Sequence, residues 1–256
     1  MKFVDSPHKI SDSPESVLLI PEIGLAHYGN LQLALNYVDL VVKLGLKVIK
    51  FQHHDPLYES SVNENFRVTH RHFPQPSRFE YWEHTSFTPE EWCYLYQYIN
   101  SYNLGFAITP NSLQSARFIF NNIKPIFWKI GSSDLLNFQL IDFLLTTDLP
   151  IILSTGLATT NDVMSLLHTY GHNPLFSFLS CISSYPAPLS QFSTERIIAL
   201  QKLVRDCPVG VSDHSASVAP ILSSFMQGTQ IFEFHLSLSN DLYSFDSSSS
   251  LTPSDV

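Results

Sequence analysis

The heptapeptide PVGVSDH at positions 208–214 has the pattern of a short buried strand that ends in polar side chains. Its two valines are β-branched and suit a strand interior. Its last three residues, Ser212, Asp213 and His214, would be costly in a core unless they face a polar site. We therefore expect this strand to end at a functional edge of a sheet.

A second strand of this kind is expected at residues 230–235, with the sequence QIFEFH, and it also ends on a histidine. The connection between the two strands has room for one helix, which we expect at residues 218–227. If both strands belong to one parallel sheet, His214 and His235 lie at the same edge, where a metal site can form. The alternative is two unrelated histidines, one hydrogen-bonded in the core and one on a loop.

Composition limits the classes of function. The 256 residues are 44% hydrophobic and 14% charged, which allows a substantial core in one domain. A formal net charge of -9 argues against a nucleic-acid partner and against polybasic membrane binding. The first 16 residues lack the apolar core of a signal peptide, and no apolar run approaches the roughly 20 residues of a membrane span. Three scattered cysteines fit a reducing compartment, so we expect a soluble cytoplasmic protein.

Outward from these two strands, the chain alternates strand and helix signals. The other expected strands cover residues 17–20, 47–52, 105–109, 126–134, 150–156 and 176–181. Helices are expected at 31–45, 89–102, 113–121 and 138–145, after residue 159, and from residue 193 to 204. Asn30, Thr88, Thr159 and Ser193 have the side chains and positions of helix N-caps.

Eight strands and seven helices in alternation predict an α/β fold, a closed (β/α)8 TIM barrel rather than an open doubly wound sheet. We expect an N-terminal extension at residues 1–16 and the barrel at 17–256. No GxGxxG follows the first strand, which disfavours a dinucleotide site. The stretch 53–87, which is rich in proline and histidine, predicts a long loop with little regular structure.

The last six residues, LTPSDV, carry the start signals of an eighth helix, with Thr252 as the cap and Asp255 at the third position. We therefore interpret the barrel as truncated before its last helix and incomplete at the C-terminus. Without that helix, the first and eighth strands are expected to be uncovered on one outer side, where apolar residues such as Ile231 or Phe234 would meet water.

Two lysines, Lys50 and Lys129, lie at strand ends inside otherwise apolar runs. With the hydroxyls of nearby serines they suit a phosphate or a phosphate-plus-carboxylate ligand. These serines are Ser132, Ser154, Ser183 and Ser212. The alternative pairs Lys50 with Glu22 and Lys129 with Asp134 as internal salt bridges.

Eight motifs occur in the order and at the intervals of a known family. They are PEIGLAHYGN, VIKFQ, AITP, WKIGSSD, PIILSTGLAT, SCISSYPAP, PVGVSDHS and FEFH, beginning at residues 21, 48, 107, 128, 150, 180, 208 and 232. They resemble the N-acetylneuraminate (sialic acid) synthase family, which includes the legionaminate and pseudaminate synthases. The resemblance covers the chain from Val17 to its end.

The resemblance implies a reaction and a set of partners. Phosphoenolpyruvate would condense with an open-chain N-acetylated amino sugar, giving a nine-carbon 2-keto sugar acid and phosphate. The family implies a (β/α)8 barrel, a C-terminal antifreeze-like domain, which we expect to be absent here, and a divalent metal, commonly Mn2+. It also implies a homodimer in the full-length form.

The resemblance also assigns residues. It makes His214 and His235 the metal ligands, with Glu22 hydrogen-bonding a metal-bound water. Around phosphoenolpyruvate it places Lys50, Thr109, Lys129, Ser132, Ser154, Ser183 and Ser212. Around the amino sugar it places Gln52, Asp134, Tyr185 and Asp246. The catalytic residues that it implies are Glu22, Lys129, His214 and His235.

Several family motifs are altered here. Asn-His-x-Gly reads AHYG at 26–29, the His-Cys pair reads Ser180-Cys181, and Gly-Ser-Gly-Glu ends in Ser133-Asp134. A second class of function therefore stays open, namely a diverged non-catalytic barrel that acts as a binding module. A metal-dependent amidohydrolase barrel is disfavoured, because His-x-His after the first strand is lacking.

Overall fold

Eight parallel strands close into a barrel in the computed structural model, which describes residues 2–5, 16–64, 77–239, 242 and 244–256. The strands are β2 (Ser16–Gly24), β3 (Val48–His53), β4 (Gly105–Pro110), β5 (Phe127–Ile130), β6 (Ile151–Ser154), β7 (Phe176–Cys181), β8 (Val209–Asp213) and β9 (Ile231–Leu236). Each pairs with the next, and β2 pairs with β9 to close the sheet. The predicted (β/α)8 TIM barrel is confirmed.

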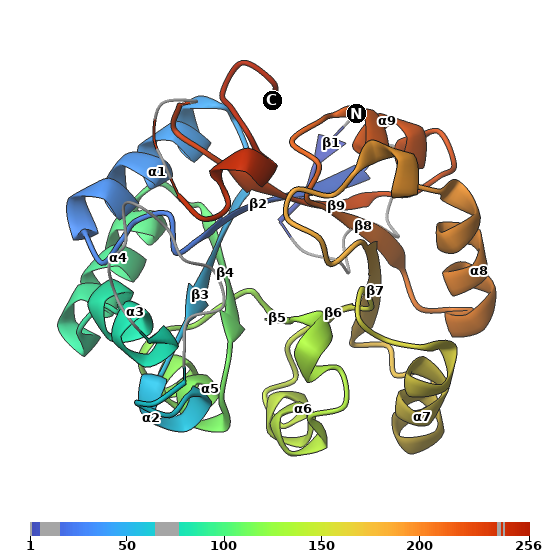
Figure 1. Cartoon of the computed structure of the whole chain (residues 1–256), viewed down its shortest axis with the longest axis horizontal. Coiled ribbons are helices and arrows are strands. Elements are labelled where there is room, and N and C mark those ends of the chain that lie inside the picture. The colour runs from blue at the N-terminus through green and yellow to red at the C-terminus, as the bar shows by residue number, and fades with distance from the viewer. Residues whose placement is uncertain (1, 6–15, 65–76, 240–241, 243) are drawn as a thin grey trace.

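Seven helices of the described chain connect successive barrel strands and surround them (Figure 1). They are α1 (Leu31–Lys43), α4 (Pro89–Ser101), α5 (Leu113–Asn122), α6 (Phe138–Leu145), α7 (Thr160–Tyr170), α8 (Thr194–Val204) and α9 (Ala219–Phe225). Within the described ranges no helix combines the length and the apolar character that a bilayer crossing requires.

The helix starts follow from their caps. Asn30, Thr88 and Thr159 each accept a hydrogen bond from the backbone N–H three residues further on, as predicted. Ser193 is the N-cap residue of α8, as predicted, but its side chain makes no cap hydrogen bond to the helix backbone. Its hydroxyl donates to the carboxylate of Glu195 and leaves the backbone of α8 uncapped.

Alternation along the strands separates two apolar cores. One set of side chains, which includes Phe51, Trp128 and Phe232, faces the helices and packs with them. The other set faces the barrel axis and forms a small inner core. Its members are Val4, Leu18, Ile20, Val48, Ala107, Phe127, Ile152, Leu179 and Ile231. On most of these strands the next inward residue, two positions further along, is polar or charged. The C-terminal end of the barrel interior is therefore polar, as expected where a functional site lies.

The segment 53–87 contains two helices, α2 (Pro56–Glu59) and α3 (Arg78–Thr85). The prediction of a loop with little regular structure was therefore wrong for these parts. Pro56 takes the first position of α2, and the hydroxyl of Ser77 caps α3 by accepting from the backbone N–H of Glu80 at 3.1 Å. Residues 65–76, which hold two of the histidines, lie outside the described residues.

Two short strands lie where the barrel closes. β1 (Lys2–Phe3) pairs with the start of β2, and β10 (Ser250–Leu251) pairs with the end of β9. Most of the expected extension, residues 1–16, lies outside the described residues. The predicted cap at Thr252 is formed in part. The Thr252 N–H donates to the Asp255 carboxylate at 2.8 Å, but the Thr252 hydroxyl also donates to that carboxylate instead of accepting from the Asp255 backbone N–H.

The outer side of β9 is covered. Phe234 is 3% exposed and packs in one core with Leu251 of β10 and with residues of α1. Ile231 is 1% exposed because it faces the inner core rather than the outside. The expectation that these two side chains meet water was therefore wrong.

Candidate functional site

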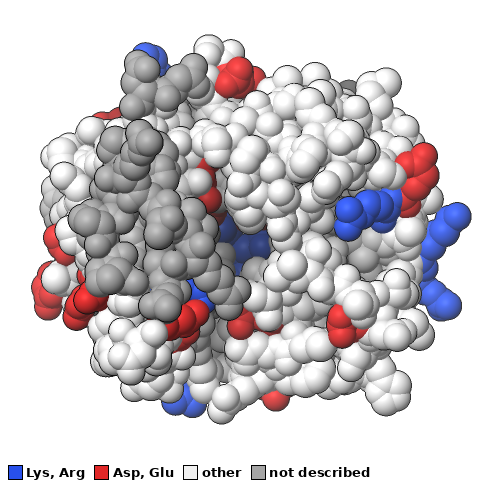
Figure 2. Space-filling model, viewed as in Figure 1, with Lys and Arg blue, Asp and Glu red and all other residues white. Residues whose placement is uncertain are grey.

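The C-terminal ends of the barrel strands surround a cavity of about 210 Å³, here called the central cavity. Figure 2 shows Lys or Arg atoms deep in a hollow near the middle of the molecule, and the cavity wall contains Lys50 and Lys129. The structure brings most of the sequence-predicted site residues onto this wall. They are Glu22, Lys50, Gln52, Thr109, Lys129, Ser132, Ser154, Tyr185, Ser212, His214 and His235.

Lys50 lies between two carboxylates. Its ammonium group forms an ion pair with Glu22 and a second one with Glu233, whose Oε1 is 3.1 Å away. All three side chains are almost fully buried. The predicted pairing of Lys50 with Glu22 is therefore observed, with Glu233 as an additional partner.

Lys129 lies on the other side of Glu233. Its Nζ donates to Ser154 Oγ at 2.7 Å and to the carbonyl of Ile130 at 2.9 Å, and it is 3.7 Å from Glu233 Oε2. The alternative pairing with Asp134 was wrong, because that carboxylate accepts from Ser133 and Asn137 instead.

Burial and the nearby charges act in opposite directions on these groups. Burial alone would lower the pKa of Lys50, but the carboxylates of Glu22 and Glu233 outweigh it and raise the pKa. For Lys129 the effect of burial is larger than the opposing effect of Glu233, so the pKa of Lys129 is lowered. Burial alone would raise the pKa of Glu233, but the two ammonium groups hold it well below its usual range. The carboxylate of Glu233 is therefore ionised.

The two histidines face each other, with ring centroids 5.5 Å apart. His214 Nδ1 lies 2.8 Å from the carbonyl oxygen of Ile182, so this nitrogen carries the proton and donates. Nε2 then has its lone pair toward the cavity, where Tyr185 Oη lies 3.1 Å away. His235 Nδ1 faces the carboxylate of Asp246 at 3.8 Å.

The imidazoles of His214 and His235 are donors of the type that divalent transition metals take. Burial, with His235 as the next cause, lowers the pKa of His214 to about 4, so its ring is neutral at pH 7, as a metal ligand must be. Among the described residues, no three His, Cys, Asp or Glu side chains form a metal-ligand group. A cation here would have the imidazoles of His214 and His235 as protein ligands and would keep positions for water or substrate.

Hydroxyl groups surround the lysines. Thr109, Ser154 and Ser212 are buried on the wall of the central cavity. Ser132 is on that wall and Ser183 is not, but their hydroxyl oxygens lie 3.3 Å apart. Hydroxyl donors and ammonium groups together suit an anion with several oxygens.

The residues predicted for a sugar are spread around the cavity. Gln52 and Tyr185 lie on its wall, and Asp246 lies beside it, next to His235. Asp134 is outside the central cavity. It ends the 3-10 turn η2 (Ser132–Asp134), which directs it into a neighbouring cavity.

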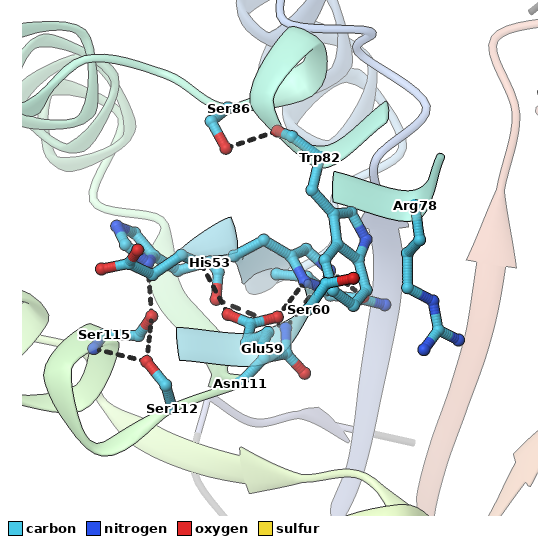
Figure 3. Close-up of polar contacts among 12 residues, drawn as sticks. His53, Glu59, Ser60, Arg78, Trp82, Ser86, Asn111, Ser112 and Ser115 are labelled. Atoms are coloured by element: carbon cyan, nitrogen blue, oxygen red, sulfur yellow. Dashed lines mark hydrogen bonds and ion pairs between the residues drawn. The ribbon is translucent and has the colours of Figure 1, made fainter. Parts of the chain in front are cut away.

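That neighbour, here called the outer cavity, has a volume of about 500 Å³. It shares Asn111 and Ser133 with the central cavity; its other lining residues are His54, Tyr58, Glu59, Arg78, Trp82, Ser112, Leu113, Gln114, Asp134, Asn137 and Gln139. Figure 3 shows Arg78 beside the Trp82 ring, with the guanidinium carbon 4.9 Å from the ring centroid. The outer cavity is thus polar with an aromatic side.

A chain of contacts links the two cavities. Gln52 Nε2 donates to Glu22 Oε1 at 2.9 Å, and Gln52 Oε1 lies 3.2 Å from His54 Nε2. His54 Nδ1 is 2.6 Å from Glu59 Oε2, and the ring of His54 stacks on Trp82 with centroids 4.5 Å apart. These contacts orient the amide of Gln52 with its N–H toward Glu22.

Some residues of the cavity wall were not predicted from the sequence. Glu233 and Cys181 line the central cavity from β9 and β7, and Asn111 lines it from beyond β4. The signal for Glu233 is the alternation Phe-Glu-Phe-His, which places it on the same side of the strand as His235. Conversely, Asp213 does not line the central cavity and accepts hydrogen bonds from Ser215 instead. Asn111 has no such signal, because alternation ends with the strand.

The fold and this geometry define a (β/α)8 barrel with a charged cavity at the C-terminal strand ends. Residues 37–256 match the sequence profile of the NeuB family. The match covers most of the chain, which therefore belongs to the NeuB family.

Similar proteins are synthases of sialic acid type. Human N-acetylneuraminate-9-phosphate synthase is 25% identical over 240 residues, which cover 93% of this chain and 67% of the human protein. Pseudaminic acid synthase of Campylobacter jejuni is 26% identical over 246 residues, covering 94% and 71%. The solved N-acetylneuraminic acid synthetase of Leptospira borgpetersenii, in complex with citrate, superposes with a TM-score of 0.80 at 25% identity, covering 95% of this chain and 81% of that one.

Proposed function

We propose that this chain condenses phosphoenolpyruvate with an open-chain N-acetylated amino sugar. The products are a nine-carbon 2-keto sugar acid and phosphate, with one water consumed. The observation that carries the proposal is the presence of two lysines and two inward histidines on one cavity wall, in a member of the NeuB family. The similarity to sialic acid-type synthases supports this reaction class.

The lysines would bind phosphoenolpyruvate. Lys50 and Lys129 offer charge-assisted hydrogen bonds to its phosphate and carboxylate oxygens. Thr109, Ser132 and Ser154 would add hydroxyl donors, joined by Ser183 and Ser212. These donors would hold the phosphate while its bond to C2 breaks, because they stabilise the charge that develops on the leaving group.

His214 and His235 would hold the metal, and we propose Mn2+ or another divalent cation. When bound, such an ion supplies a Lewis acid that polarises the aldehyde of the sugar and raises the acidity of bound water. The support lies in this chain's own residues. The hydrogen bond from His214 to Ile182 fixes the tautomer that ligates.

Carbon-carbon bond formation joins C3 of phosphoenolpyruvate to the aldehyde carbon of the sugar. Water then adds at C2 and phosphate leaves. The carboxylate of Glu22 would hydrogen-bond the water near the metal position. The hydrogen bond from Gln52 keeps this carboxylate oriented. Lys129 would stay with the phosphate through its departure. Gln52, Tyr185, Asp134 and Asp246 would contact hydroxyl and amide groups of the sugar.

A second candidate is a non-catalytic barrel of the same family that binds a ligand. The observation that favours it is the pairing of Lys50 with two carboxylates, which leaves this lysine charge-compensated before any anion arrives. We place either activity in the cytoplasm, which the three free cysteines support.

One experiment separates the two candidates. The protein is incubated with Mn2+, phosphoenolpyruvate and a panel of N-acetylated amino sugars, and phosphate release is followed. The synthase predicts release that depends on both the sugar and the metal. Binding of phosphoenolpyruvate without release for every sugar would favour the binding module.

A further inference from the structure

Glu233 has no role in the reaction as proposed above, yet it touches both lysines of the central cavity. Its side chain is 7% exposed. One carboxylate oxygen lies 3.1 Å from Lys50 Nζ, and the other lies 3.7 Å from Lys129 Nζ. A buried carboxylate between two ammonium groups holds both of them in place.

The two lysines depend on Glu233 to different degrees. Lys50 has a second carboxylate partner, Glu22. For Lys129, Glu233 is the one ion-pair partner in the described part of the chain, and its close contacts with Ser154 and the Ile130 carbonyl are with neutral oxygens. Removing the charge of Glu233 would therefore leave Lys50 paired and Lys129 unpaired.

A buried ammonium without a counter-charge loses its proton rather than bear the desolvation cost. Burial already lowers the pKa of Lys129. The charge of Glu233 has the largest effect in the opposite direction. The other groups acting on Lys129 come from several strands. Lys50 lowers its pKa further, whereas Cys181 and Glu22 raise it. His214 also lies close enough to interact with Lys129.

We propose that Glu233 is a positioning residue that keeps Lys129 in its ammonium form, held against Ser154, so that an anionic substrate meets two charged lysines. The inference rests on the proposed function, because it assumes that this cavity binds phosphoenolpyruvate. A neutral amine at Lys129 would have to take up a proton when the anion binds. The affinity of the protein for the anion would then depend on the protonation of Lys129 and fall as the pH rises. The ion pair of Glu233 with Lys129 in the native protein avoids this dependence.

The test compares Glu233→Gln with the native protein. The affinity for phosphoenolpyruvate is measured by titration calorimetry at saturating Mn2+, between pH 6.5 and 8.5. We expect the ratio of the variant's Kd to the native Kd to increase with pH, by up to about tenfold per pH unit once Lys129 is neutral. Taking the ratio cancels the titration of the ligand and of the metal site.

Matched variants identify the titrating group. Glu233→Gln is repeated in a Lys129→Gln background, where the pH dependence of the ratio should disappear. Glu233→Asp keeps the charge, so it should bind more weakly at all pH values but with the native pH profile. Glu233→Asp also serves as the test if Glu233→Gln does not fold, because a pH-dependent Glu233→Asp ratio would contradict the proposal.

Two results would overturn the inference while leaving the proposed function intact. A ratio above one that is constant with pH would mean that Glu233 acts through shape alone. A ratio below one at every pH would mean that Glu233 only repels the anion. If the native protein binds no phosphoenolpyruvate at any pH, the proposed function fails, and the inference fails with it.

Discussion

The Nδ1 atom of His214 lies 2.8 Å from the carbonyl oxygen of Ile182, and this contact decides which ring nitrogen faces the central cavity. Because Nδ1 donates its proton, Nε2 carries a lone pair toward the cavity, in the direction of His235 and Tyr185. A backbone carbonyl is a fixed acceptor, so the ring is oriented before any cation binds.

The first prediction concerns metal binding. His214→Ala and His235→Ala should each abolish stoichiometric Mn2+ binding, because each removes one of two protein ligands. Calorimetry measures the binding, and circular dichroism checks that the fold is kept. His168→Ala, on the exposed side of α7, is the matched control and should bind Mn2+ like the native protein. Undiminished binding in both cavity variants would rule out this pair of ligands.

The second prediction concerns the anion. Lys129→Ala and Lys50→Ala should each weaken phosphoenolpyruvate binding by about 1.5 to 3 kcal/mol, the range for losing a hydrogen bond to a charged group. Affinity and melting temperature are measured together. If both variants melt earlier but bind as tightly as the native protein, the lysines serve the internal ion pairs with Glu22 and Glu233 and not the ligand.

The third prediction concerns His27, which is fully buried and stacked on Phe87 at 4.3 Å. Burial, with His54 as the second cause, lowers the pKa of His27 to about 3. Below about pH 6.5 the His27 ring therefore takes up a proton in the unfolded chain but stays neutral in the folded protein. Stability from this group is present above pH 6.5 and is lost as the pH falls toward 3, by about 2 kcal/mol at pH 5.

The measurement is urea unfolding at pH 7 and pH 5. His27→Phe keeps an aromatic ring against Phe87 but cannot titrate, so its loss of stability between the two pH values should be smaller than the native loss by that amount. His168→Phe, the surface control, should lose as much stability as the native protein. Equal losses in all three proteins would show that His27 is not the titrating group.

The fourth prediction concerns packing inside the barrel. A Cβ added at Gly210 would lie 2.5 Å from the carbonyl oxygen of Ile231 and 2.6 Å from its Cβ, so Gly210→Ala forces β8 and β9 apart. We expect a loss of about 1 to 3 kcal/mol in unfolding free energy. Gly131→Ala is the control, because the nearest atom to its added Cβ is 3.8 Å away. Equal stability of the two variants would contradict this account of the inner core.

Most of the fold could be predicted from the sequence because strand and helix periods alternate on both sides of the stretch 53–87. The helix starts at Asn30, Thr88 and Thr159 were predicted correctly, since each cap acts on the backbone three residues away. Local signals were not enough at Ser193, where a nearby carboxylate competes for the hydroxyl. They also gave no warning that β10 pairs with the end of β9 and that Leu251 joins the same core as Phe234.

The cavity was predicted less completely than the barrel. Residues at inward strand positions, such as Lys50 and His235, come together because the register of parallel strands places them at one level. Strand register no longer fixes the position of a residue beyond the end of a strand. Ser132 reaches the central cavity whereas Asp134, two residues later on the same turn, reaches the outer one. The partner of Lys129 was missed because Glu233 is distant in sequence and comes close only through strand order.

The central claim is that this cavity forms a carbon-carbon bond from phosphoenolpyruvate, and isotope-labelled substrate tests it most directly. The protein is supplied with Mn2+, an N-acetylated amino sugar and phosphoenolpyruvate labelled with 13C at C3, and the product is examined by NMR. We predict that the label appears in a methylene group coupled to a sugar carbon, with one phosphate released per product and no product from Lys129→Ala. Label recovered only in pyruvate or in unreacted phosphoenolpyruvate, with every sugar offered, would contradict the account.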